Sequence, residues 1–167
     1  MIGNDAGHWT NYMPPTGDQG SYNTFVGYMS GQTNSTGAYN SFFGYKAGFG
    51  KIPEGISGNN NVAVGSNSGF NINSGSNNVF LGTNAGFTNS QGSSNVFIGN
   101  EAGYLNEIGF NNIYIGKSAG YNSGTVYCGN CLHYDPGTDS WPAGPVAWGD
   151  NNTCLGTEAG RNNKGVS

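Results

Sequence analysis

Apolar and polar residues alternate in short phrases that recur every 17 residues over most of this chain. The clearest phrase is a three-residue apolar segment followed by glycine, as in Val79-Phe80-Leu81-Gly82. Alternation at period two predicts a short β-strand, with its first and third residues on one face and its second on the other. Each phrase continues into an Ala-Gly or Ser-Gly pair, most often followed by Phe or Tyr, which predicts a second short strand. Asn, Ser and Gly, which favour turns, then follow in most copies. The pattern therefore predicts a coil that turns back on itself.

The glycine that ends the first strand marks each copy of the phrase. These glycines are Gly3, Gly27, Gly44, Gly65, Gly82, Gly99, Gly116 and Gly156, and a degenerate copy at 125–129 would bring the total to about nine. Short units that cannot bury a face alone must stack on their neighbours. We therefore predict one all-β domain over residues 1–167, a parallel β-solenoid (β-roll) of about nine imperfect 17-residue coils. The irregular spacings predict three insertions, at about 8–20, 50–57 and 129–150.

Two columns of side chains are expected inside the solenoid. Aliphatic residues at the first and third strand positions should face inward, opposite small alanines. The expected column comprises Val62, Val64, Val79, Leu81, Val96, Ile98, Ile113, Ile115 and Val126, with Ala85, Ala102 and Ala119 facing it. The asparagines that open successive coils (Asn61, Asn78, Asn95 and Asn112) should form a hydrogen-bonded amide ladder along the rod, or else serve only as turn formers.

The aromatic residues at the middle strand position should then face outward. This column comprises Phe25, Phe42, Phe80, Phe97, Tyr114 and Tyr127. A row of exposed aromatic rings is a large apolar patch, and such patches usually mark an interface. We predict an assembly interface here. A platform that faces sugar or ice, or packing beneath the chain's own insertions, remains an alternative.

The three cysteines are Cys128, Cys131 and Cys154. The Cys-x-x-Cys segment lacks the βαβ context of a redox site, the second pair that zinc requires, and the adjacent histidine of a haem attachment motif. We predict a structural disulfide from Cys154 to Cys128 or Cys131, or alternatively one within the Cys-x-x-Cys segment.

The insertion at 129–150 is rich in aromatic residues. Tyr134, Trp141 and Trp148 could stack on a sugar, whereas Asp135, Asp139 and Asp150 could hold Ca²⁺. The alternative is that a long loop packs on its own side chains, and we expect no cofactor or metal.

Composition and charge exclude several classes of function. The net charge is −4 with only five Lys and Arg, so no basic stripe can neutralise nucleic acid or anionic lipid. The apolar runs are too short to span a bilayer. The two histidines, His8 and His133, lie in separate insertions, and no nucleophile–base spacing or phosphate-binding loop is present, so we expect no enzyme.

The recurring phrase resembles the β-roll head repeats of trimeric autotransporter adhesins. It is also similar to Asn-Thr-Phe-Ile-Gly-Tyr-x-Ala-Gly repeats of bacterial surface proteins and phage tail fibres. The nearest matches are Asn23-Thr24-Phe25-Val26-Gly27-Tyr28 and Phe43-Gly44-Tyr45-Lys46-Ala47-Gly48. The resemblance implies an extracellular or cell-surface structural protein, or alternatively a virion fibre. Both ends fall inside coils without a cap, which predicts either a segment of a longer fibre or adhesin, or a subunit whose open ends stack head to tail on other copies. We expect a self-assembling filament or adhesin-like fibre subunit whose partner is itself; the alternative is a head segment that binds glycans or a host.

Overall fold

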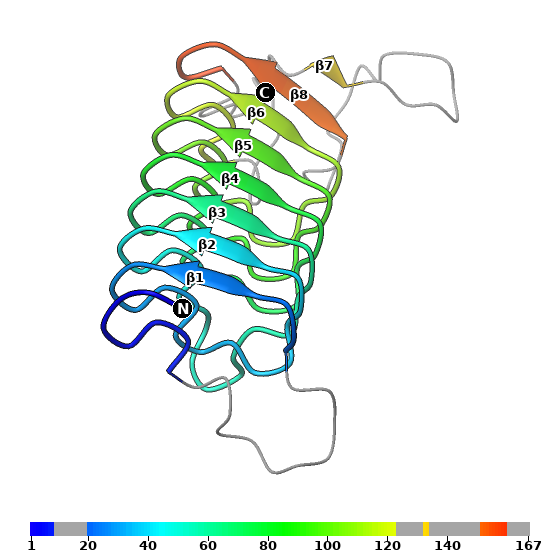
Figure 1. The fold of residues 1–167 in the computed structure, drawn as a ribbon. Coiled ribbons are helices and arrows are strands. Elements are labelled where there is room, and N and C mark those ends of the chain that lie inside the picture. Colours follow the sequence, from blue (N-terminus) through cyan, green and yellow to red (C-terminus); the bar gives the residue numbers. More distant parts are fainter. Residues whose placement is uncertain (9–19, 123–131, 134–150, 160–167) are drawn as a thin grey trace.

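The computed structural model describes residues 1–8, 20–122, 132–133 and 151–159, and every structural statement below concerns these residues. They form a stack of coils with one β-strand in each, and the described residues contain no helix (Figure 1). The strands are β1 (Thr24–Val26), β2 (Ser41–Phe43), β3 (Val62–Val64), β4 (Val79–Leu81), β5 (Val96–Ile98), β6 (Ile113–Ile115), β7 (Leu132–His133) and β8 (Asn152–Leu155). The prediction of an all-β parallel solenoid is confirmed.

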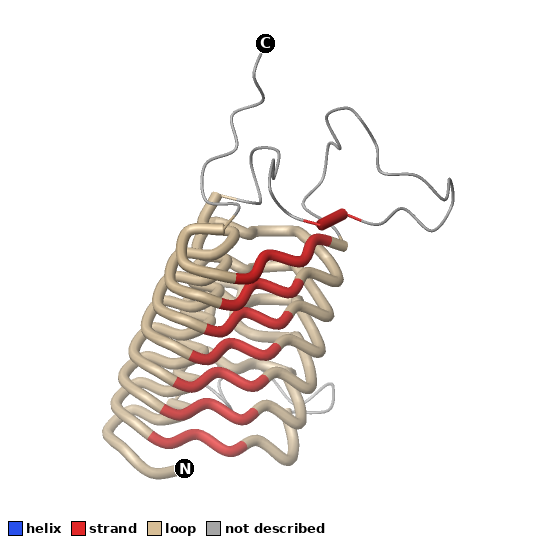
Figure 2. The backbone as a smooth tube through the Cα atoms, turned by 90° about the horizontal axis from the view of Figure 1, so that it is seen from above, coloured by secondary structure: helices blue, strands red, loops and turns tan. Residues whose placement is uncertain are grey.

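The strands form one sheet in the order β1-β2-β3-β4-β5-β6-β8-β7. All neighbours up to β8 pair in parallel and in the register of the repeat, so that Phe80 lies opposite Phe97 and then Tyr114. Seen from above, the strands lie along one side and the turns form the rest of each coil (Figure 2). Because β6 pairs directly with β8, no strand lies between them in the sheet, and the count of about nine coils was too high. The degenerate copy at 125–129 lies outside the described residues.

The expected second strand is not a strand. Residues of the Ala-Gly-Phe segment form turns, since left-handed residues flank the alanine: φ is 57° at Asn84 and 60° at Gly86. These turns nevertheless stack from coil to coil, because the amide of Gly86 donates to the carbonyl of Ala102 at 2.9 Å. Each coil is therefore one strand and one layer of stacked turns.

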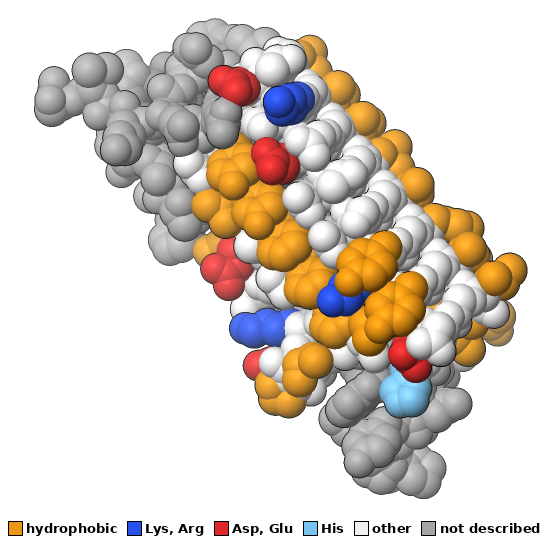
Figure 3. All heavy atoms as spheres, turned by 90° about the vertical axis from the view of Figure 1, so that its left-hand side faces the viewer, with side chains coloured by type: hydrophobic (Ala, Val, Ile, Leu, Met, Phe, Trp, Pro, Cys, Tyr) orange, Lys and Arg blue, Asp and Glu red, His pale blue; other side chains and the backbone are white. Residues whose placement is uncertain are grey.

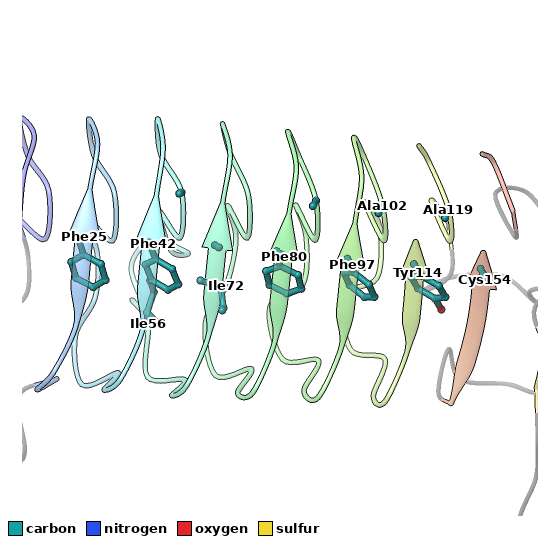
Figure 4. Close-up of a cluster of buried hydrophobic side chains, with 13 residues drawn as sticks. Phe25, Phe42, Ile56, Ile72, Phe80, Phe97, Ala102, Tyr114, Ala119 and Cys154 are labelled. Carbon is teal, nitrogen blue, oxygen red and sulfur yellow. The ribbon is translucent and has the colours of Figure 1, made fainter. Parts of the chain in front are cut away.

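The assignment of the two strand faces was wrong. The aromatic side chains at the middle position lie in the interior (Figure 4). The aliphatic residues on either side point outward. Phe25, Phe42, Phe80, Phe97 and Tyr114 are fully buried, together with Ala85, Ala102 and Ala119, which were correctly placed inside. Their rings stack on neighbouring coils, with centroids 5.4 Å apart for Phe80 and Phe97 and 4.9 Å for Phe97 and Tyr114.

A glycine in the turn layer makes room for each buried ring. A Cβ atom added to Gly103 would lie 2.5 Å from the ring of Phe97, closer than any side chain could approach. Gly120 has the same relation to Tyr114, with a distance of 2.4 Å. The Ala-Gly pair therefore leaves room for a large planar side chain from the strand.

The amide ladder is confirmed. Asn95 donates from Nδ2 to the Oδ1 of Asn78 at 3.2 Å, and its own Oδ1 accepts from the backbone and side-chain amides of Asn112. The ladder runs through Asn40, Asn61, Asn78, Asn95, Asn112 and Asn152, all buried. The second Nδ2 hydrogen of Asn95 binds the carbonyl of Gly109 at 2.7 Å, which ties the start of a coil to its end. These asparagines therefore link each coil to its neighbours by buried hydrogen bonds, in addition to forming turns.

Candidate functional site

The outward face of the sheet carries two rows of aliphatic side chains. The first and third residues of β3 to β6 point away from the core, and the burial pattern of β4 and β5 places only the middle residue inside. The two rows are Val62, Val79, Val96 and Ile113, and Val64, Leu81, Ile98 and Ile115. Figure 3 shows hydrophobic side chains following the right-hand edge of the rod, where the sheet of Figure 1 lies.

This face is flat, repetitive and without charge. Val64 is 39% exposed and Ile113 is 40% exposed, whereas the outward residues of β4 and β5 are half-buried, so the rows are partly open to solvent in a single chain. Among the described strands β1 to β6 and β8, no outward position carries a charged residue. An apolar face of this kind is the feature that marks contact surfaces on soluble proteins. The aliphatic face, and not the aromatic column predicted from the sequence, is therefore the candidate assembly interface.

A second aromatic ladder runs along the turn layer. It comprises Phe49, Phe70, Phe87, Tyr104 and Tyr121, whose neighbouring ring centroids are each 4.9 Å apart. The rings lie nearly parallel and are half-buried, so each ring covers the face of the next and only edges reach solvent. Sugars stack on open ring faces, so the middle of this ladder is not a sugar platform. The repeat of Ala-Gly-Phe/Tyr is the sequence signal that points to it.

Two further stacks of tyrosines lie on the coils of β1 and β2. Tyr22 stacks on Tyr39 with centroids 5.0 Å apart, and Tyr28 stacks on Tyr45 at 5.6 Å. The ammonium group of Lys46 lies 5.3 Å from the Tyr45 ring centre and contacts the end of the second aromatic ladder as well. Sequence reasoning missed these pairs because it compared only the apolar core of the repeat.

One phenol has a shifted pKa. Burial raises the pKa of Tyr104 above its ordinary value, and the neighbouring Tyr121 and the carboxylate of Glu101 add to the increase. Glu101 also accepts a hydrogen bond from the hydroxyl of Ser118 at 3.2 Å. Burial and the two neighbouring acidic groups together favour the protonated form of the Tyr104 hydroxyl.

Most of the predicted ligand and cysteine residues lie outside the described segments. These are Tyr127, Cys128, Cys131, Tyr134, Asp135, Asp139, Trp141, Trp148 and Asp150. Cys154 is described and occupies the interior column above Tyr114, where it is 1% exposed. Within the described ranges, no group of three His, Cys, Asp or Glu residues could hold a metal ion. The same part of the chain contains no helix with the length and hydropathy needed to cross a membrane.

Comparison with known proteins adds no assignment. No family model matches the chain, and neither a curated protein nor a solved structure matches it. The described geometry therefore carries the functional argument.

Proposed function

We propose that this chain is a structural, non-enzymatic subunit of an extracellular filament or adhesin-like fibre, and that it assembles with copies of itself. The observation that carries the proposal is the uncharged aliphatic face on β3 to β6. Leaving this face in water costs free energy at about 25 cal/mol per Å² of apolar surface. Covering it with a second copy removes that cost.

A second copy fits the face because both surfaces have the same period. Parallel strands repeat at about 4.8 Å, so the rows of one rod match the rows of another at every coil. The absence of charge on the described outward positions means that like-charge repulsion does not oppose the contact. A ligand of different period would match at only one or two coils.

The rest of the molecule supports a structural role. The rod is held together by the repeated asparagine hydrogen bonds and by stacked aromatic rings. Its described residues hold no cluster of metal-binding side chains. An extracellular location agrees with the predicted disulfide, since disulfides persist in oxidising compartments. The glycan-binding alternative depends on Trp141 and Trp148, which lie outside the described residues.

The test is the assembly state of the purified protein, measured by light scattering after size exclusion and by negative-stain electron microscopy. We expect oligomers or fibres in the parent and monomers in the Leu81→Lys, Ile98→Lys double variant, because two buried charges would be left unpaired at the contact. Gln91→Lys with Asn100→Lys is the matched control, since it adds the same two charges at exposed positions off the sheet. A parent that stays monomeric, or sheet-face variants that assemble like the control, would refute the proposal.

A further inference from the structure

Three pairs of tyrosines stack in register on adjacent coils. The centroid distances and interplanar angles are 5.0 Å and 10° for Tyr22 and Tyr39, 5.6 Å and 11° for Tyr28 and Tyr45, and 4.9 Å and 3° for Tyr104 and Tyr121. Each pair thus holds two phenol rings face to face. The three pairs differ in exposure and in their charged neighbours.

The pair formed by Tyr22 and Tyr39 is strained as well as exposed. Both residues have left-handed backbones, with φ of 63° and 59°, which bulky side chains rarely adopt. The same position in later coils holds the residues Asn60, Asn77, Ser94, Asn111 and Asn151. The tyrosine rings are 76% and 57% exposed, so burial does little to offset a strain of about 1–3 kcal/mol per residue. The burial of these rings therefore gives little reason for tyrosine here, and strain of this kind is typical of functional positions.

We propose that Tyr22 and Tyr39 form an oxidative cross-linking site, where a haem peroxidase with hydrogen peroxide joins the two rings into dityrosine within one chain. The proposal stands on the tyrosine geometry and does not depend on the aliphatic face. Its result is a covalent tie between the coil of β1 and the coil of β2.

The chemistry balances within the pair. Each phenol loses one electron and one proton and becomes a tyrosyl radical, with spin density on the carbons next to the oxygen. The two radicals form one carbon–carbon bond between those ring carbons, and the hydrogen on each bonded carbon then moves to the phenol oxygen, which restores both aromatic rings. The two electrons and two protons that leave the pair reduce one hydrogen peroxide to two waters.

Proximity favours coupling inside the chain over coupling between chains. Two groups held in contact react as if each were present at a very high local concentration, and well-oriented pairs reach about 10⁵ M or more. The rings of Tyr22 and Tyr39 already face each other at 5.0 Å, and their exposure leaves them room to close to bonding distance. A dilute protein should therefore give the intrachain product.

The other two pairs are poorer substrates. The ammonium group of Lys46, 5.3 Å from the ring centre of Tyr45, disfavours removal of an electron from that ring. Tyr104 and Tyr121 are half-buried, which restricts their contact with an enzyme. The raised pKa of Tyr104 also opposes loss of its proton. The three stacks therefore give a built-in comparison of oxidation sites on one molecule.

The experiment treats the full chain, at low concentration, with a haem peroxidase and limiting hydrogen peroxide. Dityrosine fluorescence gives the yield, and tandem mass spectrometry of chymotryptic peptides locates the link. We expect a product of monomer mass, two hydrogens lighter, that joins Tyr22 to Tyr39. Tyr39→Phe, which keeps the ring and the stack, should lower the yield at least about fivefold, whereas Tyr45→Phe should change it by less than about twofold.

Circular dichroism of both variants checks that the fold is kept. The proposal is overturned if the main link maps to either of the other pairs or to another residue, if the main product joins two chains, or if the folded protein couples no faster than the chain unfolded in urea. It is also overturned if Tyr39→Phe reacts as fully as the parent.

Discussion

The amide ladder should contribute more to stability than any surface contact, and Asn95→Ala tests this. The side chain of Asn95 takes part in four hydrogen bonds: two donated to Asn78 and Gly109, and two accepted from Asn112. Each such bond is worth about 1 kcal/mol net, and each buried group left without a partner costs about 1–3 kcal/mol. Removing the amide leaves polar groups of Asn112 and Gly109 without a partner in the interior. We therefore expect the free energy of unfolding to fall by about 3–6 kcal/mol.

The assay is urea unfolding followed by far-ultraviolet circular dichroism. Asn100→Ala is the matched control, because Asn100 is exposed and its amide makes only one contact of 3.4 Å, with the carbonyl of Thr83. Surface changes of this kind stay within about 0.5 kcal/mol. If Asn95→Ala costs no more than about 1 kcal/mol beyond the control, the ladder is not a main source of stability.

Asn95→Asp adds a pH dependence of known sign. A carboxylate at this position would be buried and would face the oxygens of Asn78 and Gly109, so its pKa in the folded state should rise above the unfolded value of about 3.9. Below a pH of about 3.9 the carboxyl group is protonated in both the folded and the unfolded state, and the variant has its full stability. This stability is lost as the pH rises through the pKa of the folded state. We expect this variant to be more stable at acidic than at neutral pH relative to the parent, as measured by urea unfolding at each pH. A variant whose stability relative to the parent does not fall with rising pH would contradict the buried ladder.

Three further predictions concern the core and the cysteines. Phe97→Ala should destabilise the chain by about 3–5 kcal/mol in urea unfolding, because it empties a fully buried ring site, and a loss of assembly without a loss of stability would contradict that placement. Gly99→Ala should prevent normal stacking and lower the thermal midpoint sharply, since φ is 131° and the new Cβ would lie 2.5 Å from the carbonyl oxygen of the next coil; an unchanged midpoint would contradict this. Cys154→Ser should remove the predicted disulfide and lower stability by about 2–5 kcal/mol more under oxidising than under reducing conditions, and an equal loss in the presence of a reducing agent would argue against the bond.

The repeat period and the ladder asparagines were readable from the sequence because both depend on spacing alone. A period of 17 residues places identical residues above one another, and a stacked polar residue in the interior must bond to its copies. The parallel sheet follows from the same spacing. These features required no knowledge of side-chain packing.

The choice of inner face was not readable from the strand itself. In Val96-Phe97-Ile98 both faces are apolar, so alternation at period two gives no direction. The direction is set by the turn layer, where Gly103 leaves a space that fits a ring. Reading the strand together with the glycine six residues later would have placed Phe97 inside and exposed Val96 and Ile98.

Because every coil is bonded only to the coils beside it, the rod has a particular response to mechanical load. Strands β1 and β8 lie at opposite ends of the parallel stack, so tension applied along the rod acts on the coil-to-coil interfaces in series. The interfaces would then separate one at a time. A released coil of 17 residues extends to roughly 58 Å, whereas it occupied about 4.8 Å of the rod. The coils from β3 to β6, which repeat every 17 residues, would therefore lengthen in equal steps under force and dissipate work at each one.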